Sequence, residues 1–501
     1  MSKPSTTLFM DWNDIDTGRL QPTLDPARLS EEGRKQVEIF DREHHLHFPL
    51  TGHGTRRLRL PHGVKITIEK AQKSEPWLMP EHPWEQVLNF PTVIQEEGRY
   101  RCWYGASSGG KKELVFDGER GVETKGSSLC YAESEDGFHW TKPSVGVHSF
   151  MGSKDNNIAS EYFHTASVFR DDSADPSERY KFFHFAEIPD APKDSDLPGY
   201  GLYGAVSPDG FHWTPTEQPL IRYFCDTQNI GSWDPINEEY VGYFRSHISG
   251  RSISRSATKD FRDWPHPVTI LYPGSEEDPA TDYYTSCYTC YPDDPSLKLM
   301  FPALFHHNSD NVSVRLAMSR NGHHFSWVSR EPVIEVGGLD AFDSGSMYAN
   351  PNLVRLPDGR LALPYQGIRM GHDEGWYGVF YEHCEGKGEI SFAWAIWEDG
   401  RLAGIEAEDY GEFWTKAALF EGDAIHLNAR TGRVGKVEIE IWNERGEEAL
   451  PGFSFSECAP FTGDGIWTPC QWKGDLQSLK GRKIQLRYRL SIAKVFGCRF
   501  V

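Results

Sequence analysis

The stretch Ser134-Glu135-Asp136-Gly137-Phe138-His139-Trp140 recurs almost unchanged as Ser207-Pro208-Asp209-Gly210-Phe211-His212-Trp213. An Asp-Gly pair readily takes the positive φ of a tight turn, and the aromatic residues behind it return on the next strand and pack on the sheet. Each copy therefore predicts a β-hairpin. A looser copy occupies residues 319–327, and a degenerate copy occupies residues 258–264.

These hairpins recur along much of the chain. They lie roughly 50 to 75 residues apart, which is about the length of one four-stranded propeller blade. Between them, five pairs of aromatic-rich strands are joined by acidic or polar turns, beginning near residues 92, 167, 230, 284 and 352. The sequence therefore predicts an all-β protein built on a five-bladed β-propeller.

The region beyond residue 410 has a different pattern. Residues 437–442 and 484–490 alternate apolar and polar side chains, as half-buried antiparallel strands do, and the Asp-Gly hairpin does not recur there. We expect a C-terminal β-sandwich in residues 411–501. It would follow an N-terminal extension in residues 1–60 and a propeller catalytic domain in residues 61–410.

The net charge of the chain indicates which kinds of partner it can bind. The chain has 73 acidic and 52 basic residues, for a formal net charge of −21. Such a field repels nucleic acid and anionic membranes, so we expect neither as a partner and favour a neutral oligosaccharide or glycoside.

The cysteines and the chain start indicate the compartment. There are nine cysteines without paired spacing, which argues against a disulfide framework. The first residues lack the apolar stretch of a secretory signal, and the chain has no apolar run long enough to span a membrane. We therefore expect a cytoplasmic protein; whether it forms a homo-oligomer stays open.

Acidic residues stand at or just before the first strand of four predicted blades. In a propeller these strand starts converge around the central channel. Cleavage of a glycosidic bond needs a carboxylic acid that protonates the leaving oxygen and a carboxylate that acts as nucleophile or base. We therefore predict four catalytic residues: Glu85, Asp226, Asp282 and Asp343. The alternative for each is a local role in capping a turn through its backbone.

Other side chains are candidates for holding a sugar. Aromatic rings stack on the apolar faces of sugars, and amide, imidazole and guanidinium groups donate hydrogen bonds to hydroxyls. The predicted substrate-binding residues are Trp84, His164, Asn229, Arg245 and Trp376. The histidine pairs lack the spacing of a metal site, so we expect no metal and no cofactor.

These segments resemble a known group of proteins. The chain is similar to uncharacterised bacterial proteins related to glycoside hydrolase family 32. The matching segments are Pro83-Trp84-Glu85, Arg101-Cys102-Trp103-Tyr104, Leu129-Cys130-Tyr131-Ala132, Asn156-Asn157-Ile158, Arg179-Tyr180-Lys181, Asp226-Thr227-Gln228-Asn229, Trp233-Asp234-Pro235, Tyr240-Val241-Gly242-Tyr243-Phe244-Arg245, Phe342-Asp343-Ser344-Gly345 and Gly452-Phe453-Ser454. The resemblance implies a five-bladed propeller with a C-terminal β-sandwich and hydrolysis of glycosidic bonds, including those of furanosides. The nucleophile, stabiliser and acid motifs of true invertases are missing from the predicted blades, so the resemblance assigns no role to a particular acid.

The sequence thus predicts a glycoside hydrolase that cleaves terminal glycosidic bonds, such as those of fructosides or arabinosides. One alternative is a glycoside phosphorylase, which needs a cluster of Arg, Lys or His around phosphate; the sequence shows no such cluster. Another is a non-catalytic carbohydrate-binding propeller, which would keep the tryptophans but need no converging acids. The sugar, the linkage and the choice between retention and inversion stay open.

Overall fold

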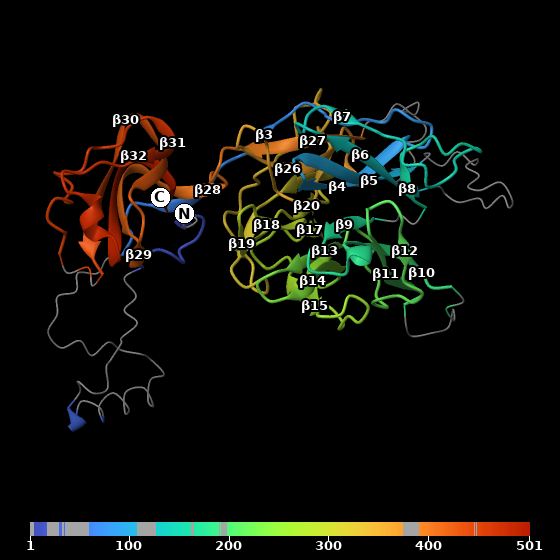
Figure 1. Cartoon of the computed structure of the whole chain (residues 1–501), viewed down its shortest axis with the longest axis horizontal. Helices are drawn as coiled ribbons and strands as arrows, with labels where there is room; N and C mark the ends of the chain where they lie inside the picture. Colours follow the sequence, from blue (N-terminus) through green and yellow to red (C-terminus); the bar gives the residue numbers. More distant parts are fainter. Residues whose placement is uncertain are drawn as a thin grey trace. The chain divides into compact units, whose positions relative to one another are not determined.

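The computed structural model describes residues 5–17, 30–32, 35, 60–107, 127–161, 165–189, 191, 198–373, 390–444, 446 and 448–501 (Figure 1). The chain divides into two compact units, Ile68–Asp399 and Met1–Thr67 with Gly400–Val501. The second boundary lies before the expected residue 410, because β28 (Ala403–Trp414) pairs with a strand of the C-terminal sheet.

The unit Ile68–Asp399 consists of antiparallel sheets that follow one another along the chain. Blade 1 contains β4 (Val87–Glu96), β5 (Arg99–Ser107), β6 (Ser127–Ser134) and β7 (Trp140–Thr141), with β8 (Ile158–Ser160) also paired to β6. Blade 2 contains β9 (Ser167–Arg170), β10 (Tyr180–Glu187), β11 (Tyr200–Ser207) and β12 (Thr214–Pro215). Blade 3 contains β13 (Ile230–Asp234), β14 (Glu239–Ser246), β15 (Ser252–Thr258) and β16 (Val268–Leu271).

Blades 4 and 5 have interrupted strands. Blade 4 contains β17 (Thr281–Thr285), β18 (Tyr288–Tyr291), β19 (Asp294–Met300), β20 (Ala303–His306), β21 (Asn311–Val314), β22 (Ala317–Ser319) and β23 (Ser326–Trp327). Its first strand breaks between β17 and β18, where Cys287 has a φ of 41°. Blade 5 contains β24 (Ser346–Ala349), β25 (Val354–Arg355), β26 (Leu361–Ile368), β27 (Ile390–Trp397) and β3 (Gln72–Lys73).

The blades form a closed ring. The strand β4 contacts β9, β9 contacts β13, β17 contacts β14 and β15, β24 contacts β20 and β21, and β4 contacts β26 and β27. The segment that precedes blade 1 supplies β3 as the last strand of blade 5, where Lys73 pairs with Ala395. The prediction of a five-bladed β-propeller is confirmed by this strand order.

The repeated hairpin is built by its own local hydrogen bonds. In the first copy, Ser134 Oγ accepts from the Gly137 N–H at 2.8 Å, and Trp140 Nε1 donates to the Gly137 carbonyl at 2.8 Å. Gly137 has a φ of 82°, and Gly210 in the second copy has a φ of 84°. The closing tryptophans are half-buried, because each folds back over its own turn.

The same turns join neighbouring blades. Trp394 Nε1 of blade 5 donates to the carbonyl of Gly137 in blade 1 at 2.7 Å. Trp103 Nε1 of blade 1 donates to the carbonyl of Gly210 in blade 2 at 2.8 Å. Both indoles are completely buried. The hairpin motif therefore shapes its own turn and also presents a carbonyl to the preceding blade.

The other unit is one antiparallel sheet of seven strands. They are β1 (Ser5–Leu8), β2 (Lys65–Ile68), β28, β29 (Ala418–Phe420), β30 (Ile425–Asn443), β31 (Asp464–Pro469) and β32 (Arg482–Phe500). The described start of the chain belongs to this sheet, since Ser5 pairs with Phe500, and is not a separate extension. The expected sandwich stays a prediction: the structure records one continuous sheet in which β30 and β32 shift register at bulges.

Candidate functional site

Glu85 lies just before β4 and is completely buried. Its Oε1 accepts from the Tyr104 hydroxyl at 2.5 Å, and its Oε2 accepts from Lys142 Nζ at 2.8 Å. The N–H groups of Glu81 and His82 also donate to Oε2. Burial acts to raise the pKa of Glu85, but Lys142 and the hydrogen bonds outweigh it and lower the pKa. These surroundings are those of a satisfied, enclosed ion pair.

Trp84, a predicted sugar platform, belongs to the core of blade 1. Its Nε1 donates to Asn157 Oδ1 at 2.9 Å. Its ring stacks on His82 at a centroid separation of 4.6 Å and meets the edge of Phe150 at 4.9 Å. With 8% exposure, the indole has little surface to offer a ligand.

Asp343 precedes the first strand of blade 5 and is also completely buried. Its Oδ2 accepts from Lys73 Nζ at 2.7 Å and from the Tyr365 hydroxyl at 3.0 Å, whereas its Oδ1 is buried without a hydrogen-bond partner. Because Lys73 lies on β3, this ion pair fastens the strand that closes the ring.

Asp282 lies at the start of β17, and its side chain is 10% exposed. Its Oδ2 accepts from Arg251 Nη1 at 2.6 Å and from His307 Nε2 at 3.0 Å. Burial opposes ionisation, but the hydrogen bonds from Arg251 and His307 outweigh it and lower the pKa of Asp282. Both partners are partly exposed, so the charged carboxylate stands at the edge of the surface.

Asp226 is half-buried in the loop that leads into β13. Arg245 Nη1 donates to its main-chain carbonyl. Asn229 Nδ2 donates to the carbonyls of Cys225 and Thr227 at 2.8 and 2.9 Å. The amide of Asn229, predicted to bind substrate, is therefore engaged in shaping the loop that carries Asp226.

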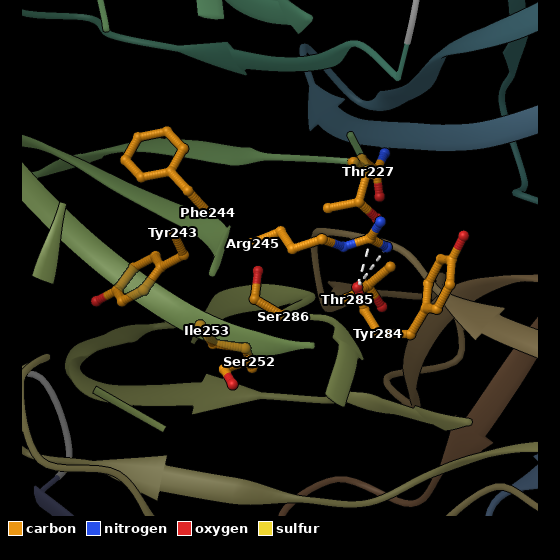
Figure 2. A pocket seen from close by; sticks show the side chains of 10 residues that line it. Thr227, Tyr243, Phe244, Arg245, Ser252, Ile253, Tyr284, Thr285 and Ser286 are labelled. Carbon is orange, nitrogen blue, oxygen red and sulfur yellow. Dashed lines mark hydrogen bonds between the residues drawn. The ribbon is translucent and has the colours of Figure 1, made fainter. Parts of the chain in front are cut away.

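Arg245 is a buried cation in neutral surroundings. Figure 2 shows it extending from β14 toward Thr227 and Tyr284. Its Nη2 donates to the Tyr284 carbonyl at 3.1 Å, and its guanidinium lies 4.2 Å from the centroid of that ring. The residue is 6% exposed, and Nε is buried without a hydrogen-bond partner.

A small pocket surrounds Arg245 in the described part of blades 3 and 4. Its side chains leave no space for even a water-sized ligand in this structure, whereas ordinary ligand pockets enclose ~300–1,000 Å³. Three more buried atoms in its lining have no hydrogen-bond partner: Gln228 Oε1, Thr285 Oγ1 and Ser286 Oγ. Polar groups are rarely buried unpaired. The lining of this pocket can therefore make further hydrogen bonds, whereas both oxygens of Glu85 already have partners.

The fold brings further groups to Tyr284 that the sequence analysis missed. The Arg251 guanidinium lies 5.1 Å from the centroid of the Tyr284 ring, and the His372 ring lies 4.6 Å from it. We call the set Arg245, Arg251, Asp282, Tyr284, His307 and His372 the Tyr284 cluster. Its members come from blades 3, 4 and 5, so no local spacing in the sequence could reveal it.

The sequence showed no cluster of Arg, Lys or His of the kind that a phosphorylase needs, but the fold brings such side chains together around Tyr284. Burial and the charges of Arg245 and Arg251 lower the pKa of the adjacent His247. Burial, Arg251, Arg245 and His307 likewise lower the pKa of His372, to about 4. Two arginines and three histidines thus lie near one another, an arrangement that the sequence did not suggest.

Two of the predicted substrate-binding residues fall in segments that the structure does not describe. His164 and Trp376 lie outside the described residues. Within the described ranges, no group of three His, Cys, Asp or Glu side chains is placed to hold a metal ion. The same ranges contain no helix long and apolar enough to cross a membrane.

Comparison with known proteins gives short sequence matches. No family model matches the chain. The uncharacterized protein Rv1502 of Mycobacterium tuberculosis (strain ATCC 25618 / H37Rv) is 32% identical over 126 residues, 25% of this chain and 33% of that protein. The uncharacterized protein MT1551 of strain CDC 1551 / Oshkosh is 39% identical over 72 residues, 14% and 21% of the two chains. The chain therefore spans a third or less of the curated relatives it matches.

Solved structures give longer but more distant matches. A glycosyl hydrolase from Bacteroides ovatus is 14% identical with a TM-score of 0.44, covering 67% of this chain and 95% of that one. A β-1,2-mannobiose phosphorylase from Listeria innocua is 13% identical with a TM-score of 0.44, covering 66% and 97%. The propeller assignment rests on the strand order described above, and the resemblance to family 32 stays a prediction.

Proposed function

We propose that the chain is a glycoside hydrolase whose active site is the Tyr284 cluster together with Asp226. The observation that carries the proposal is a chain of contacts between the loops that hold Asp226 and Asp282. Arg245 bonds the main-chain carbonyls of Asp226 and Tyr284, and Arg251 lies over the Tyr284 ring and pairs with Asp282, an ionised carboxylate at the edge of the surface. Both acids stand where the first strand of a blade begins. Glu85 and Asp343 have no exposed surface from which to reach a substrate.

The surroundings of the two acids suit different roles. Asp282 is held as an anion by Arg251 and His307, which fits a nucleophile, a base or a stabiliser of the oxocarbenium-like transition state. Asp226 is then the proton donor to the leaving oxygen. The half-buried Tyr284 ring offers an apolar face to the sugar.

The test is a screen of aryl furanosides and pyranosides, with sucrose as a fructoside, for the wild type and four variants. We expect Asp226→Asn and Asp282→Asn to lose turnover and Glu85→Gln and Asp343→Asn to keep it. Loss of turnover in the second pair alone would move the active site to blades 1 and 5. Folded Asp226→Asn and Asp282→Asn proteins with wild-type rates would refute the proposal.

A specific observation favours a glycoside phosphorylase as the second candidate. Arg245, Arg251, His247, His307 and His372 lie near one another. Arginines bind phosphate through charge-assisted hydrogen bonds, and neutral imidazoles can donate further hydrogen bonds to it. Adding inorganic phosphate to the same screen separates the two. Release of sugar phosphate in place of free sugar would identify phosphorolysis.

A further inference from the structure

A buried tyrosine–histidine pair joins the first strand of blade 5 to the segment after β26. The Tyr348 hydroxyl lies 2.6 Å from His372 Nδ1, and the two residues are 5% and 7% exposed. The rings of Tyr284 and Phe305 enclose the imidazole, with centroid separations of 4.6 and 4.5 Å. His372 is therefore packed against the same ring that contacts Arg245 and Arg251.

Backbone hydrogen bonds fix the segment that carries this histidine. The His372 N–H donates to the Asp310 carbonyl at 3.0 Å, and the Asp373 N–H donates to Asp310 Oδ1 at 2.7 Å. A ring held from both its backbone and its faces has one orientation to offer a ligand, which is how binding groups are preorganised.

The contact with Tyr348 determines which ring nitrogen carries the proton. Burial raises the pKa of Tyr348 well above its ordinary value, so the phenol keeps its proton and needs an acceptor. The structure places His372 Nδ1 2.6 Å from the hydroxyl, and we assign the phenol as the donor because an imidazole nitrogen is a better acceptor than a phenol oxygen. An imidazole that accepts at Nδ1 and is neutral carries its proton on Nε2.

The neighbouring charges keep the ring neutral. Burial has the largest influence, and Arg251, Arg245 and His307 add to it, while Asp310 opposes it; together they lower the pKa of His372 to about 4. Among the described residues, no hydrogen bond to His372 Nε2 is recorded. Nε2 is also absent from the fully buried, unpaired atoms of those residues, so part of its surface is accessible. The Nε2–H group is thus free to donate to a ligand.

We propose that His372 is a substrate-binding residue that donates its Nε2–H to an oxygen of a neutral sugar, and that Tyr348 is the positioning residue that fixes this tautomer. The inference rests on the proposed function, because it names a ligand contact of the same site. A neutral donor matches a hydroxyl oxygen, whereas a charged substrate group would be better matched by the arginines.

Nitrogen NMR of the full chain with ¹⁵N-labelled histidine tests the tautomer without any need for turnover. We expect His372 to be protonated on Nε2 at neutral pH, and its Nε2 shift to move on addition of L-arabinose or D-fructose. His372→Phe provides the assignment by loss of one signal. An Nδ1-protonated ring, or an Nε2 shift that both sugars leave unchanged, would overturn the proposal.

Kinetics on an aryl glycoside turned over in the screen test the contact itself. His372→Phe keeps an aromatic ring but removes the donor, so KM should rise about tenfold with little change in kcat, as the loss of one neutral hydrogen bond implies. Tyr348→Phe should give a smaller rise together with a mixed tautomer signal. The matched control is His82→Phe, a histidine that also stacks on an aromatic ring but lies in blade 1.

These outcomes separate the two proposals. A chain that hydrolyses no glycoside but whose Nε2 signal responds to either sugar refutes the hydrolase and supports the His372 contact. An active enzyme whose folded His372→Phe variant keeps wild-type KM supports the hydrolase and overturns the contact.

Discussion

Glu85 and Arg245 are both buried charges that hold loops at the beginning of a blade, yet their surroundings differ. Glu85 accepts hydrogen bonds from Lys142, Tyr104 and two main-chain N–H groups. The recorded partners of Arg245 are two carbonyls and an aromatic ring, and one of its nitrogens is buried without a partner. One charge is neutralised inside the fold and the other is not.

We interpret this difference as the one between a structural site and the proposed functional site. A buried ion pair with every oxygen engaged needs nothing from outside the protein. An unneutralised buried cation surrounded by unpaired hydroxyl and amide groups is costly to fold, and such costs are retained mainly at functional sites. The sequence ranked Glu85 and Asp226 alike, and only the partners in space distinguish them.

The largest expected effect tests the enclosed pair. Lys142→Met leaves Glu85 buried without its counter-charge and should lower the free energy of unfolding by about 3–5 kcal/mol. Arg245→Met removes a cation that has no acidic partner among the described residues, so two carbonyl hydrogen bonds and the contact with the Tyr284 ring are lost, and it should cost about 1–3 kcal/mol. Urea denaturation measures both values. Equal losses of unfolding free energy in the two variants would contradict the proposed difference between the Glu85 and Arg245 sites.

The second prediction compares activity. Asp226→Asn should reduce kcat by about 10²–10³-fold, because a group that acts on developing charge contributes far more in the transition state than in the ground state. The asparagine side chain still makes turn hydrogen bonds, so the fold should be retained. Glu85→Gln should keep kcat within about threefold, since that carboxylate is completely buried. Steady-state kinetics of both variants on one substrate measure the two kcat values, and a larger loss in Glu85→Gln would contradict the prediction.

The third prediction concerns acid stability. Because the pKa of Glu85 is lowered in the folded protein, its ionisation stabilises the fold above its unfolded pKa of about 4.3, and this stabilisation is lost as pH falls through the lower, folded value. The free energy of unfolding should therefore fall less steeply below pH ~4 in Glu85→Gln than in the wild type. Denaturation curves from pH 3 to 6 measure the slope. Parallel slopes would show that other carboxylates dominate acid unfolding.

The propeller was predictable because its signal is local. Gly137 and its partner Ser134 lie within one hairpin, so the turn can be inferred from a few consecutive residues. The bond from Trp103 to the Gly210 carbonyl spans 107 positions, and the closing strand β3 comes from a distant part of the chain. Such contacts depend on how the blades close into a ring, which no local pattern specifies.

The candidate site was predictable only in part for the same reason. The position of Asp226 and Asp282 at blade starts follows from counting strands. Whether a basic side chain neutralises an acid depends on residues far away in the sequence, as the pairing of Lys73 with Asp343, 270 positions apart, shows. Burial cannot be read from local sequence either, since Trp84 lies in the core despite standing outside any repeat.

The smallest expected effect tests the unpaired groups beside Arg245. Thr285→Val keeps the shape of the side chain and removes a buried hydroxyl that has no partner, so the protein should gain up to about 1 kcal/mol of unfolding free energy. Turnover should fall in the same variant if that hydroxyl binds the substrate, because sites adapted for function commonly give up stability.

The matched control is Asn157→Leu, beside Glu85. The Asn157 amide donates to the Tyr104 hydroxyl and to a main-chain carbonyl, so this variant should lose about 1–3 kcal/mol of unfolding free energy and leave kcat unchanged. If Thr285→Val instead destabilised the protein as much as the control, the hydroxyl would have to be paired in solution. The surroundings of Arg245 would then be as fully hydrogen-bonded at Thr285 as those of Glu85 are, and the proposed difference between the two would be wrong.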